Sequence, residues 1–491
     1  MENKTPKKKK AEKLTNPPDP KLKPNLSSKM KVHFMGIGGS GISAVAALAK
    51  NHGFNVSGCD LEKSTAYSDK LNKAKIKVFT GHNVGHIKNY DLLVVSPAII
   101  YQNLNHPEYQ KALKENKVVV WNKFVGEYLL TDKNVIAVSG THGKGTTTAM
   151  ASLLFEFAQL DPNVIIGATV PQWSSNYRIG DSDIFIIEAD EFYEKFLDYS
   201  PSTIIINNIE FDHPDYFKNE NEIIKSFEKF CRLLKNDRNL IVNLDSQGVI
   251  RLLEKLKNIR GLTTYGYSLN PNPGFKTKYL ITGNIVEKNP NGTRFRVYSD
   301  ELGIDTEIKL TIPGDYNVSN ALGVIALAKI FKIPDEVTKQ ILANYNGLGR
   351  RFEKVFDKNG IIIYDDYAHH PTAIKKTLDA LKQRYPTSRI ICINEPHSFS
   401  RTKALLDEYK GVFESADKVI IGPIFKARDT KTFGITGKNI LVKAMHKDII
   451  YEDSIKYIIG LLKKEIKKGD VVIVMGAGES YLWTREIVKN I

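Results

Sequence analysis

Short apolar runs alternate along the chain with stretches whose apolar residues have helical spacing. Runs such as KVHFM, NVIAVS, DIFII and VVIVM have the length of buried strands, and the helical stretches SAVAALAK and TTTAMASLLFEF follow the first two of them after glycine-rich turns. This alternation predicts strand–helix–strand units and a parallel sheet with helices packed against it. We therefore expect an α/β protein.

The pattern begins anew at three places, which predicts three domains after an N-terminal tail. We place the tail and the domains at residues 1–30, 31–130, 131–345 and 346–491. The second domain departs from strict alternation near its end, where YLITGNIV, TRFRVYS and TEIKLTI are separated by Asn-Pro and Asn-Gly turns. Such turns connect antiparallel strands, so we expect antiparallel hairpins inserted into this domain.

Composition limits the class of protein. At 491 residues the chain is too long for one hydrophobic core. Its hydrophobic fraction of 42% and charged fraction of 25% are typical of a soluble globular protein, and no apolar run is long enough to span a membrane. Nine lysines and three acidic residues give the tail a net charge of +6, which predicts disorder. The tail lacks the apolar segment of a signal peptide, so we expect a cytoplasmic protein.

Charge and cysteine content exclude further classes. The rest of the chain carries +9 of the formal net charge of +15. Its lysines are scattered and not grouped with aromatic residues, which argues against a nucleic-acid partner. Cys59, Cys231 and Cys392 lie far apart and match no metal-ligand spacing. We expect them to be free thiols in a reducing compartment.

The clearest chemical signal is the segment GTHGKGTT at residues 140–147, between a predicted strand and a predicted helix. A glycine-rich turn in this position directs backbone N–H groups and a helix N-terminus toward phosphate oxygens. Lys144 adds positive charge, and a neighbouring hydroxyl can reach Mg²⁺. The general phosphate-loop pattern places a glycine where this chain has Val138 and a hydroxyl where it has Gly145. Despite these departures, the segment predicts an ATP-binding loop.

Acidic side chains follow two later strands of the same domain. They are Glu188, Asp190 and Glu191 after DIFII, and Asp212 and Asp215 after TIIINNI, where His213 lies between the two aspartates. Mg²⁺ prefers carboxylate oxygens beside nucleotide phosphates, and neighbouring parallel strands would bring Glu188 and His213 to the same rim as the loop. Solvated loop charges are the alternative interpretation.

A second glycine-rich turn, GIGGSG, follows the first strand. Its glycines are Gly36, Gly38, Gly39 and Gly41, and Asp60 follows at a distance suited to a dinucleotide fingerprint. By itself this turn fits either a redox cofactor or the pyrophosphate of a nucleotide sugar. No hydride chemistry is recognisable downstream.

Polar clusters also end two strands of the third domain. They are Asp365, Asp366, Tyr367, His369 and His370, and further on His397 and Arg401. Open parallel sheets bind ligands at the carboxyl ends of their strands. The paired histidines lack partners with the spacing of a closed zinc site, so contacts to a nucleotide and a small zwitterion fit better. Arg350 and Arg351, in the preceding linker, are suited to reach phosphate.

Taken in order, these segments resemble the Mur ligase family from Lys31 to about Trp483. The motifs that carry the resemblance are HFMGIGGSGIS, SGTHGKGTTTAM, EADEFYEKFL, NNIEFDHPDYF, IPGDYNVSNAL, GLGRRFE, DDYAHHPTAI, EPHSFSRTK and MGAGES. The resemblance implies a Rossmann-like N-terminal domain that binds a UDP-sugar, a central P-loop-type ATPase domain with the antiparallel insertion, and a Rossmann-like C-terminal domain that closes on substrates.

The resemblance also implies an activity and its requirements. We expect an ATP- and Mg²⁺-dependent ligase of peptidoglycan biosynthesis that joins L-alanine to the carboxylate of UDP-N-acetylmuramate. The carboxylate would attack the γ-phosphate to give an acyl phosphate, from which the amine displaces phosphate. Positioning and charge stabilisation supply most of the catalysis in such a transfer.

Site residues follow from their places in the motifs. For ATP the resemblance implies Gly140, Thr141, His142, Gly143, Lys144, Gly145 and Thr146 at the phosphates, Asn317 and Asn320 at the adenine, Asp365 at the ribose, and Arg351 near the phosphates. For Mg²⁺ it implies Thr146, Glu188 and His213. For the UDP-sugar it implies Gly36, Gly38, Gly39, Gly41 and Ser96, and for the amino acid Tyr367, His369, His397 and Arg401. The residues with direct roles in the reaction would be Lys144, Glu188, His213, His369 and Arg401.

Two positions depart from the family pattern. Gly145 stands where a threonine usually follows the loop lysine, so Thr146 is expected to take over a Mg²⁺ contact. Ser398 follows His397 where an arginine is usual, which leaves glycine and serine as alternatives to L-alanine. A ligase that recycles murein tripeptide is the alternative within the family. A non-catalytic UDP-sugar or nucleotide sensor is the alternative from another class, and the presence of Lys144, Glu188 and His213 argues against it.

Overall fold

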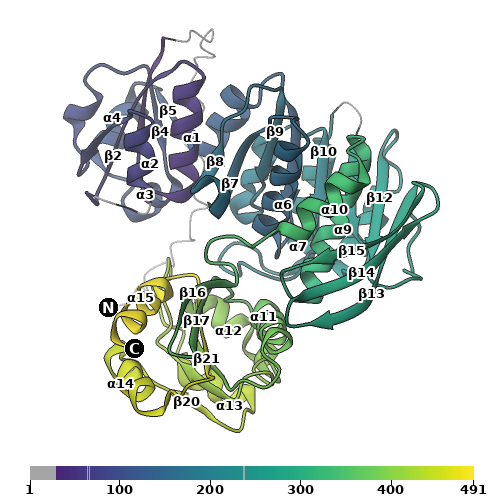
Figure 1. The fold of residues 1–491 in the computed structure, drawn as a ribbon. Helices are drawn as coiled ribbons and strands as arrows, with labels where there is room; N and C mark the ends of the chain where they lie inside the picture. The colour runs from purple at the N-terminus through teal and green to yellow at the C-terminus, as the bar shows by residue number, and fades with distance from the viewer. Residues whose placement is uncertain (1–28, 64, 66, 236–237) are drawn as a thin grey trace, which may run out of the picture. The chain divides into compact units, whose positions relative to one another are not determined.

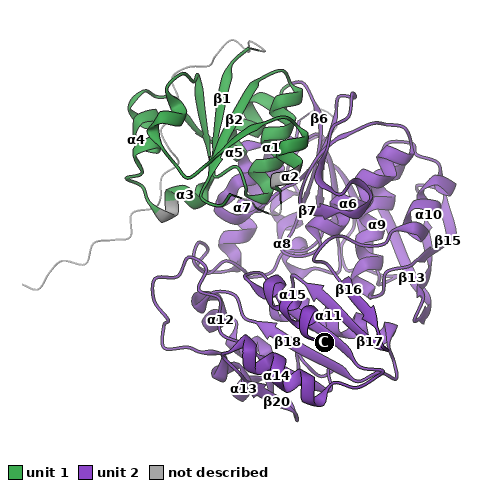
Figure 2. Cartoon of the chain, turned by 60° about the vertical axis from the view of Figure 1, so that its left-hand side comes forward, with its two compact units in different colours: residues 1–131 green, residues 132–491 purple. Residues whose placement is uncertain are grey.

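The computed structural model describes residues 29–63, 65, 67–235 and 238–491. The chain forms two compact units that divide between Thr131 and Asp132 (Figure 2). Three sheets with helices packed on them make up these units (Figure 1), which confirms the predicted three-domain α/β fold. Residues 1–28 of the predicted basic tail lie outside the described residues, and the border predicted at residue 345 stays a prediction.

The first unit contains one sheet whose five strands are all parallel, in the order β3-β2-β1-β4-β5. The strands are β1 Lys31–Met35, β2 Asn55–Asp60, β3 Lys77–Thr80, β4 Leu92–Val95 and β5 Val118–Val120. The helices are α1 Ser40–Asn51, α2 Ser68–Lys73, α3 Pro97–Gln102, α4 Pro107–Lys114 and α5 Trp121–Phe124. The strand order reverses between β1 and β4, which is where open parallel sheets bind ligands.

The second unit begins with a ten-stranded sheet in the order β15-β14-β13-β12-β11-β10-β6-β9-β7-β8. Its strands are β6 Asn134–Ser139, β7 Asn163–Val170, β8 Ser175–Arg178, β9 Ile184–Glu188, β10 Thr203–Ile206, β11 Asn239–Asn243, β12 Thr263–Ser268, β13 Tyr279–Asn289, β14 Gly292–Ser299 and β15 Ile304–Leu310. Its helices are α6 Lys144–Phe157, α7 Glu220–Arg232, α8 Gln247–Leu256, α9 Asp315–Ile330 and α10 Asp335–Asn344. Strands β13, β14 and β15 pair antiparallel, as predicted.

The second unit ends with a six-stranded sheet in the order β16-β17-β21-β18-β19-β20, parallel except for the edge strand β16. Its strands are β16 Glu353–Lys358, β17 Ile361–Asp366, β18 Ile390–Glu395, β19 Lys418–Ile421, β20 Ile449–Tyr451 and β21 Val471–Gly476. Its helices are α11 Pro371–Arg384, α12 Phe399–Ala404, α13 Gly437–Ala444, α14 Ile455–Glu465 and α15 Ser480–Asn490.

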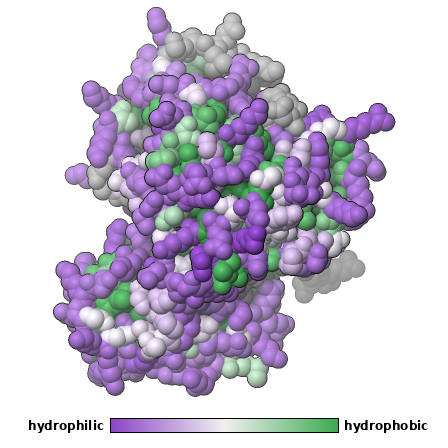
Figure 3. All heavy atoms as spheres, turned by 45° about the vertical axis from the view of Figure 1, so that its right-hand side comes forward, coloured by the Kyte–Doolittle hydropathy of each residue, from purple (hydrophilic) through white to green (hydrophobic). Residues whose placement is uncertain are grey.

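Burial follows the apolar pattern of the strands. The central strands β6, β9 and β10 are buried almost throughout, and α6 and α9 pack against each other and against strands of this sheet. One face of the surface shows mostly hydrophilic side chains with apolar patches between them (Figure 3). In the part of the chain that the structure describes, no helix is both long and apolar enough to cross a bilayer.

Candidate active site

The predicted phosphate loop forms the expected strand–turn–helix unit. β6 ends at Ser139 and α6 begins at Lys144. Between them, Gly140 and Gly143 have φ angles of 130° and 81°, which side chains rarely tolerate. A Cβ atom on Gly143 would lie 2.6 Å from Oδ1 of Asn320. The N-terminus of α6 has no side-chain cap, so its backbone N–H groups are available to an anion.

Two asparagines to which the sequence analysis gave no role hold this loop in place. Asn207 and Asn208 follow β10, the strand next to β6. The Asn208 side chain accepts a hydrogen bond from the His142 N–H at 2.8 Å and donates one to the His142 carbonyl at 3.1 Å. The Asn207 amide donates to Oγ1 of Thr147 at 3.0 Å. The polar pair at the end of TIIINNI was the available sequence signal.

Lys144 folds back over the loop and forms a buried ion pair. Its Nζ donates to the Gly140 carbonyl at 2.6 Å and to the two oxygens of Glu191 at 2.8 and 3.2 Å. Burial raises the pKa of Glu191 to about 7 against the attraction of Lys144, and the Asp190 carboxylate adds to that rise. Although burial opposes its charge, the Glu191 carboxylate raises the pKa of Lys144. A phosphate in the loop would compete with Glu191 for this ammonium group.

Glu188 lies beside the loop, as predicted. A Cβ atom on Gly145 would be 3.5 Å from Oε2 of Glu188, and this oxygen accepts a hydrogen bond from the Gly167 N–H at 2.6 Å. Thr146 is in the first turn of α6 and is partly exposed. Carboxylate and hydroxyl oxygens at the phosphate end of the loop are the donors that Mg²⁺ prefers, so Glu188 and Thr146 fit this ion.

Arg401 connects three other residues at the carboxyl ends of the strands. Its guanidinium donates to Oδ1 of Asp212 at 2.7 Å, to Nδ1 of His397 at 2.9 Å and to Nδ1 of His213 at 3.2 Å. The His213 ring also stacks on Phe192. Because Nδ1 of His213 accepts from Arg401, its lone pair is occupied. A Mg²⁺ contact by His213 stays a prediction, and it requires this hydrogen bond to be released.

The remaining predicted amino-acid ligands surround Arg401. The rings of His369 and His397 lie 5.4 Å apart between centroids, and Nδ1 of His369 donates to the Tyr367 carbonyl at 2.9 Å. Burial, followed by the charge of Arg401, lowers the pKa of His397 to about 3 and that of His369 well below its ordinary value. Both rings are therefore neutral near pH 7. The lone pair of His397 already accepts from Arg401, whereas Nε2 of His369 is left as a hydrogen-bond acceptor.

His142, Glu210 and His370 bring ligand-type atoms within 4.8 Å of one another. Both nitrogens of His370 are already engaged, because Nε2 donates to the Phe211 carbonyl at 3.2 Å and Nδ1 accepts from the Thr372 N–H at 3.2 Å. His370 thus offers no free lone pair. This trio fits a hydrogen-bonded contact between the loop and α11 better than a metal site.

Two buried groups in the region predicted for the nucleoside lack partners. They are Nδ2 of Asn320 and Oδ1 of Asp365. Buried polar atoms in folded proteins are nearly always hydrogen-bonded, so each is suited to a ligand. Burial, opposed by Arg350, raises the pKa of Asp365 to about 6. Asn317 is instead occupied, since its amide donates to the Pro313 carbonyl at 2.7 Å.

The two linker arginines have different surroundings. Arg350 donates to the Gly476 carbonyl at 3.0 Å and to Oγ of Ser480 at 3.1 Å, which ties the linker to β21 and α15. The guanidinium of Arg351 lies over the Tyr367 ring at 4.5 Å from its centroid. Arg351 thus lies over the ring of another residue predicted to bind substrate.

The predicted UDP-sugar residues come together in the first unit. The N–H groups of Gly36 and Ile37 donate to the Cys59 carbonyl at 2.8 and 3.1 Å, and the Gly38 N–H donates to Oδ2 of Asp60 at 2.8 Å. Ser96 is adjacent, because a Cβ atom on Gly36 would lie 3.1 Å from its Cβ.

The helix after this turn is also shaped by its glycines. Gly39 precedes α1 without a side-chain cap. A Cβ atom on Gly41 would approach the Trp121 ring to 3.0 Å. The close packing and the uncapped helix N-terminus suit a pyrophosphate.

Comparisons with known proteins identify the family of this chain. Residues 31–130 match the Mur ligase family catalytic domain, residues 138–328 the Mur ligase middle domain, and residues 350–478 the Mur ligase glutamate ligase domain. A UDP-N-acetylmuramate–L-alanine ligase of Caldicellulosiruptor bescii is 37% identical over 91% of this chain and 96% of its own length. One of Clostridium tetani is 37% identical over 92% of this chain and 96% of its own length.

Solved structures of ligases of this family have a similar fold. The structure of a UDP-N-acetylmuramate–alanine ligase from Thermotoga maritima has a TM-score of 0.74 at 26% identity and covers 94% of this chain and 98% of its own. A murein peptide ligase from Psychrobacter arcticus, at 24% identity with a TM-score of 0.67, covers 94% and 98% and shows the shared fold alone. With the matches to three family domains and the long relatives above 30% identity, the chain belongs to the Mur ligase family.

Proposed function

We propose that this protein joins L-alanine to the carboxylate of UDP-N-acetylmuramate with ATP, a cytoplasmic step of peptidoglycan biosynthesis. The family uses ATP, and the relatives that match over nine-tenths of the chain are ligases for these two substrates. The observation that carries the proposal is the loop at Gly140–Thr147, with Lys144 inside it and Glu188 beside it. That arrangement suits transfer of a terminal phosphoryl group.

The loop and its neighbours would hold ATP. Backbone N–H groups at the start of α6 would receive phosphate oxygens, and Lys144 would move from Glu191 to the phosphates. Asn320 and Asp365 each have an unpartnered buried atom that an adenine and a ribose hydroxyl would satisfy. Arg351 would add charge near the phosphates. Glu188 and Thr146 would hold Mg²⁺, which when bound offsets charge on the transferring phosphoryl group.

The amino acid that accepts the acyl group would bind at Arg401 and the side chains near it. A zwitterionic amino acid has a carboxylate, which a guanidinium binds well, and an ammonium group, which would donate a hydrogen bond to Nε2 of the neutral His369 ring. His369 and His397 are neutral for the reason given above, and Tyr367 lies beside them. We assign the amino acid to these four side chains. The glycine turn of the first unit, with Ser96, would hold the UDP pyrophosphate.

Carboxylate activation explains why ATP is needed. A carboxylate repels an attacking amine, whereas an acyl phosphate has a good leaving group. Formation of the acyl phosphate moves the γ-phosphoryl group to the sugar-borne carboxylate, and attack by the amine then releases inorganic phosphate. The chain contributes positioning and a charged, largely buried site, which together account for most of the rate in transfers of this kind.

The activity is tested by measuring phosphate release from purified protein with ATP, Mg²⁺ and UDP-N-acetylmuramate. We expect release only when an amino acid is added, with L-alanine above glycine and L-serine. The tripeptide L-Ala-γ-D-Glu-meso-diaminopimelate is included because murein peptide ligases share the fold. A preference for the tripeptide would replace L-alanine as the acceptor, and equal release without the UDP-sugar would refute the proposal.

A further inference from the structure

A cluster of metal-binding side chains lies inside the first unit, away from the ATP loop. It consists of His33 on β1, Cys59 on β2, His86 in the short helix Val84–Ile87 and Glu108 on α4. One ligand-type atom from each lies within 4.8 Å of all the others. Three of the four residues are buried, with exposed fractions of 1% or less, and only His86 is partly exposed.

The spacing of these atoms suits a tetrahedral metal ion. Nε2 of His33 is 3.3 Å from Oε1 of Glu108, Nδ1 of His86 is 3.9 Å from the same oxygen, and Sγ of Cys59 is 3.6 Å from both Glu108 oxygens. Zinc bonds of about 2.0–2.3 Å in a tetrahedron place neighbouring ligand atoms about 3.3–3.8 Å apart. The distances from the other three ligand atoms to Glu108 are therefore close to the edge lengths of such a site, and the remaining distances are at most 4.8 Å.

Each of the two histidines has a buried nitrogen within ion-pair distance of Glu108 that forms no hydrogen bond to it. Nε2 of His33 and Nδ1 of His86 are buried and form no hydrogen bond. The other nitrogen of His33 lies 2.8 Å from Oγ of Ser57, and the His86 ring stacks on Phe79 at 4.5 Å between centroids. A hydrogen bond to the far nitrogen and a fixed ring plane are the features that orient metal-bound histidines.

The donor set selects the ion. Two imidazoles, one thiolate and one carboxylate are typical zinc ligands, whereas Mg²⁺ and Ca²⁺ require oxygen donors. When a divalent cation binds, the Cys59 thiol would release its proton, and the cation would balance the two negative charges of the thiolate and the carboxylate in the buried site. Since all four positions come from the protein, the site is of the closed, structural type.

We propose that the first unit binds a structural Zn²⁺ ion through His33, Cys59, His86 and Glu108. The Cys59 carbonyl accepts the N–H groups of Gly36 and Ile37, so the ion would fix the backbone that supports the glycine turn. The role assigned to the four side chains is one of positioning and stability. The zinc proposal stands independently of the ligase activity.

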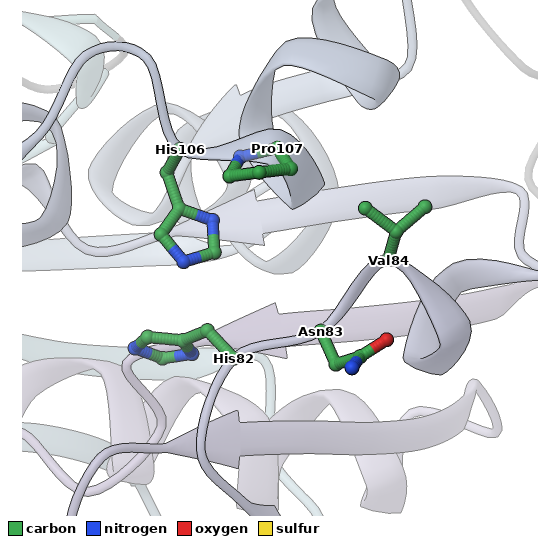
Figure 4. A pocket seen from close by; sticks show the side chains of 5 residues that line it. All are labelled: His82, Asn83, Val84, His106 and Pro107. Atoms are coloured by element: carbon green, nitrogen blue, oxygen red, sulfur yellow. The ribbon is translucent and has the colours of Figure 1, made fainter.

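A pocket next to the cluster offers a path for the ion. It has a volume of about 200 Å³ and is lined by His82, Asn83, Val84, His106 and Pro107. In Figure 4 the side chains of His82 and His106 point toward each other, and their rings are nearly perpendicular with 5.3 Å between the centroids. Nδ1 of His82 lies 3.1 Å from Sγ of Cys59, so His82 connects the pocket to the cluster and serves as an outer partner of the thiolate.

The first test is the metal content of the full-length chain, purified without a histidine tag, equilibrated with Zn²⁺ and dialysed. We expect one equivalent of zinc by mass spectrometry, and loss of most of it in Cys59→Ser. The matched control is Cys392→Ser, another buried free thiol, which lies in the second unit and should retain the zinc. A wild-type chain without zinc would overturn the proposal.

A second test does not depend on how well Cys59→Ser folds. In the Co²⁺-loaded chain we expect a thiolate-to-cobalt charge-transfer band, and Zn²⁺ should raise the melting temperature. The partly exposed His86 is changed to Gln, which should weaken Zn²⁺ affinity at least about tenfold, since loss of even an outer partner of a metal ligand costs about 10–100-fold. Equal affinity in His86→Gln, or a cobalt spectrum without the thiolate band, would place the metal elsewhere and refute the site.

Discussion

Asp365 and Asp366 are adjacent in sequence, but their surroundings are opposite. Asp366 accepts hydrogen bonds from the N–H groups of Phe352 and Ala368 at 2.6 and 2.7 Å, and so holds the backbone on both sides of the strand end. Asp365 has a buried oxygen without a partner, and burial raises its pKa to about 6. One aspartate is therefore satisfied within the fold and the other is suited to a ligand.

This contrast predicts separate effects of two alanine variants. Asp365→Ala should raise the KM for ATP about tenfold or more and change the free energy of unfolding by less than about 1 kcal/mol, because Oδ1 has no partner and Oδ2 forms only an ion pair of 3.5 Å with the partly exposed Arg350. Asp366→Ala should lower the free energy of unfolding by about 1–3 kcal/mol, since two backbone donors lose their acceptor. Steady-state kinetics and urea denaturation of both variants check this. A large loss of stability in Asp365→Ala would contradict the assignment.

His370 predicts a pH dependence of stability. Burial, with a contribution from His142, lowers its pKa to about 4, and its Nδ1 accepts the Thr372 N–H, a bond that protonation would break. The unfolded chain binds this proton near pH 6.5, so between pH 6.5 and 4 the unfolded state holds more protons and stability falls as the pH falls. The loss from this group approaches about 3 kcal/mol at pH 4.

Urea denaturation at several pH values between 7.5 and 5 measures this loss. His370→Gln should be less stable than the wild type at pH 7.5 but should lose less stability on acidification, because the titrating group is gone. His213 and His397 also have lowered pKa values, so they contribute to the change of the unfolding free energy with pH in the wild type. Identical slopes in the wild type and the variant would exclude His370 as a contributor.

The sequence predicted residues such as Lys144, Glu188 and Gly143 because their signals lie in short segments at strand ends. The partners of Asn207, Asn208 and Glu191 could not be predicted. These side chains bond to the loop at residues 140–147, which is distant in sequence, and an amide or carboxyl group does not by itself indicate which residue it contacts. His33, Cys59, His86 and Glu108 come from four separate elements. Their spacing in the sequence does not indicate a metal site, because the four residues come together only in the folded chain.

The strands, like the site residues, could be predicted where the signal lies in a short segment of sequence. Buried central strands such as β6 and β21 read as continuous apolar runs, and the hairpins of β13, β14 and β15 were indicated by their turns. β16 was not predicted, because EKVFDK is an edge strand that is mostly exposed and has little apolar pattern. β20 has three residues, all partly exposed, which is too short for a periodic signal.

The turn before α6 predicts different tolerance at two glycines. Gly143→Ala places a Cβ 2.6 Å from Asn320 at a φ angle of 81°, so it should cost about 1–3 kcal/mol of unfolding free energy and weaken ATP binding at least about tenfold. Gly145→Ala is the matched control. Its Cβ would meet the flexible Leu348 side chain at 3.1 Å and Oε2 of Glu188 at an ordinary contact distance of 3.5 Å, and alanine favours the helix.

Nucleotide-analogue binding by calorimetry and thermal denaturation distinguish the two variants. We expect Gly145→Ala to bind within a few-fold of the wild type. If Gly143→Ala binds equally well, then the left-handed turn does not form the phosphate site. If both variants fail equally, the loop requires glycine for a reason other than the backbone angle.

The two glycine-rich turns to which we assign ATP and the UDP-sugar lie in different compact units. The turn at Gly36–Gly41 is supported by Cys59, Asp60 and Ser96 of the first unit, and the turn at Gly140–Thr147 by Asn207, Asn208 and Glu191 of the second. No residue that supports one turn contributes a hydrogen bond to the other among the described residues. The two binding reactions therefore rest on separate sets of contacts.

Because the two turns have separate contacts, we expect a substitution at one turn to weaken binding of its own ligand only. Lys144→Ala should abolish turnover and weaken binding of a non-hydrolysable ATP analogue, with no change in UDP-N-acetylmuramate binding. Asp60→Ala, which removes the acceptor of the Gly38 N–H, should weaken UDP-N-acetylmuramate about tenfold and leave the analogue unaffected. When each ligand is measured alone, the double variant should show the sum of the two free-energy losses within about 0.5 kcal/mol, as independent sites do. Calorimetry of the four proteins measures both affinities. If Lys144→Ala weakens the UDP-sugar as strongly as the ATP analogue, the loop does not act as a dedicated ATP site, and the assignment of Lys144 to the phosphates is wrong.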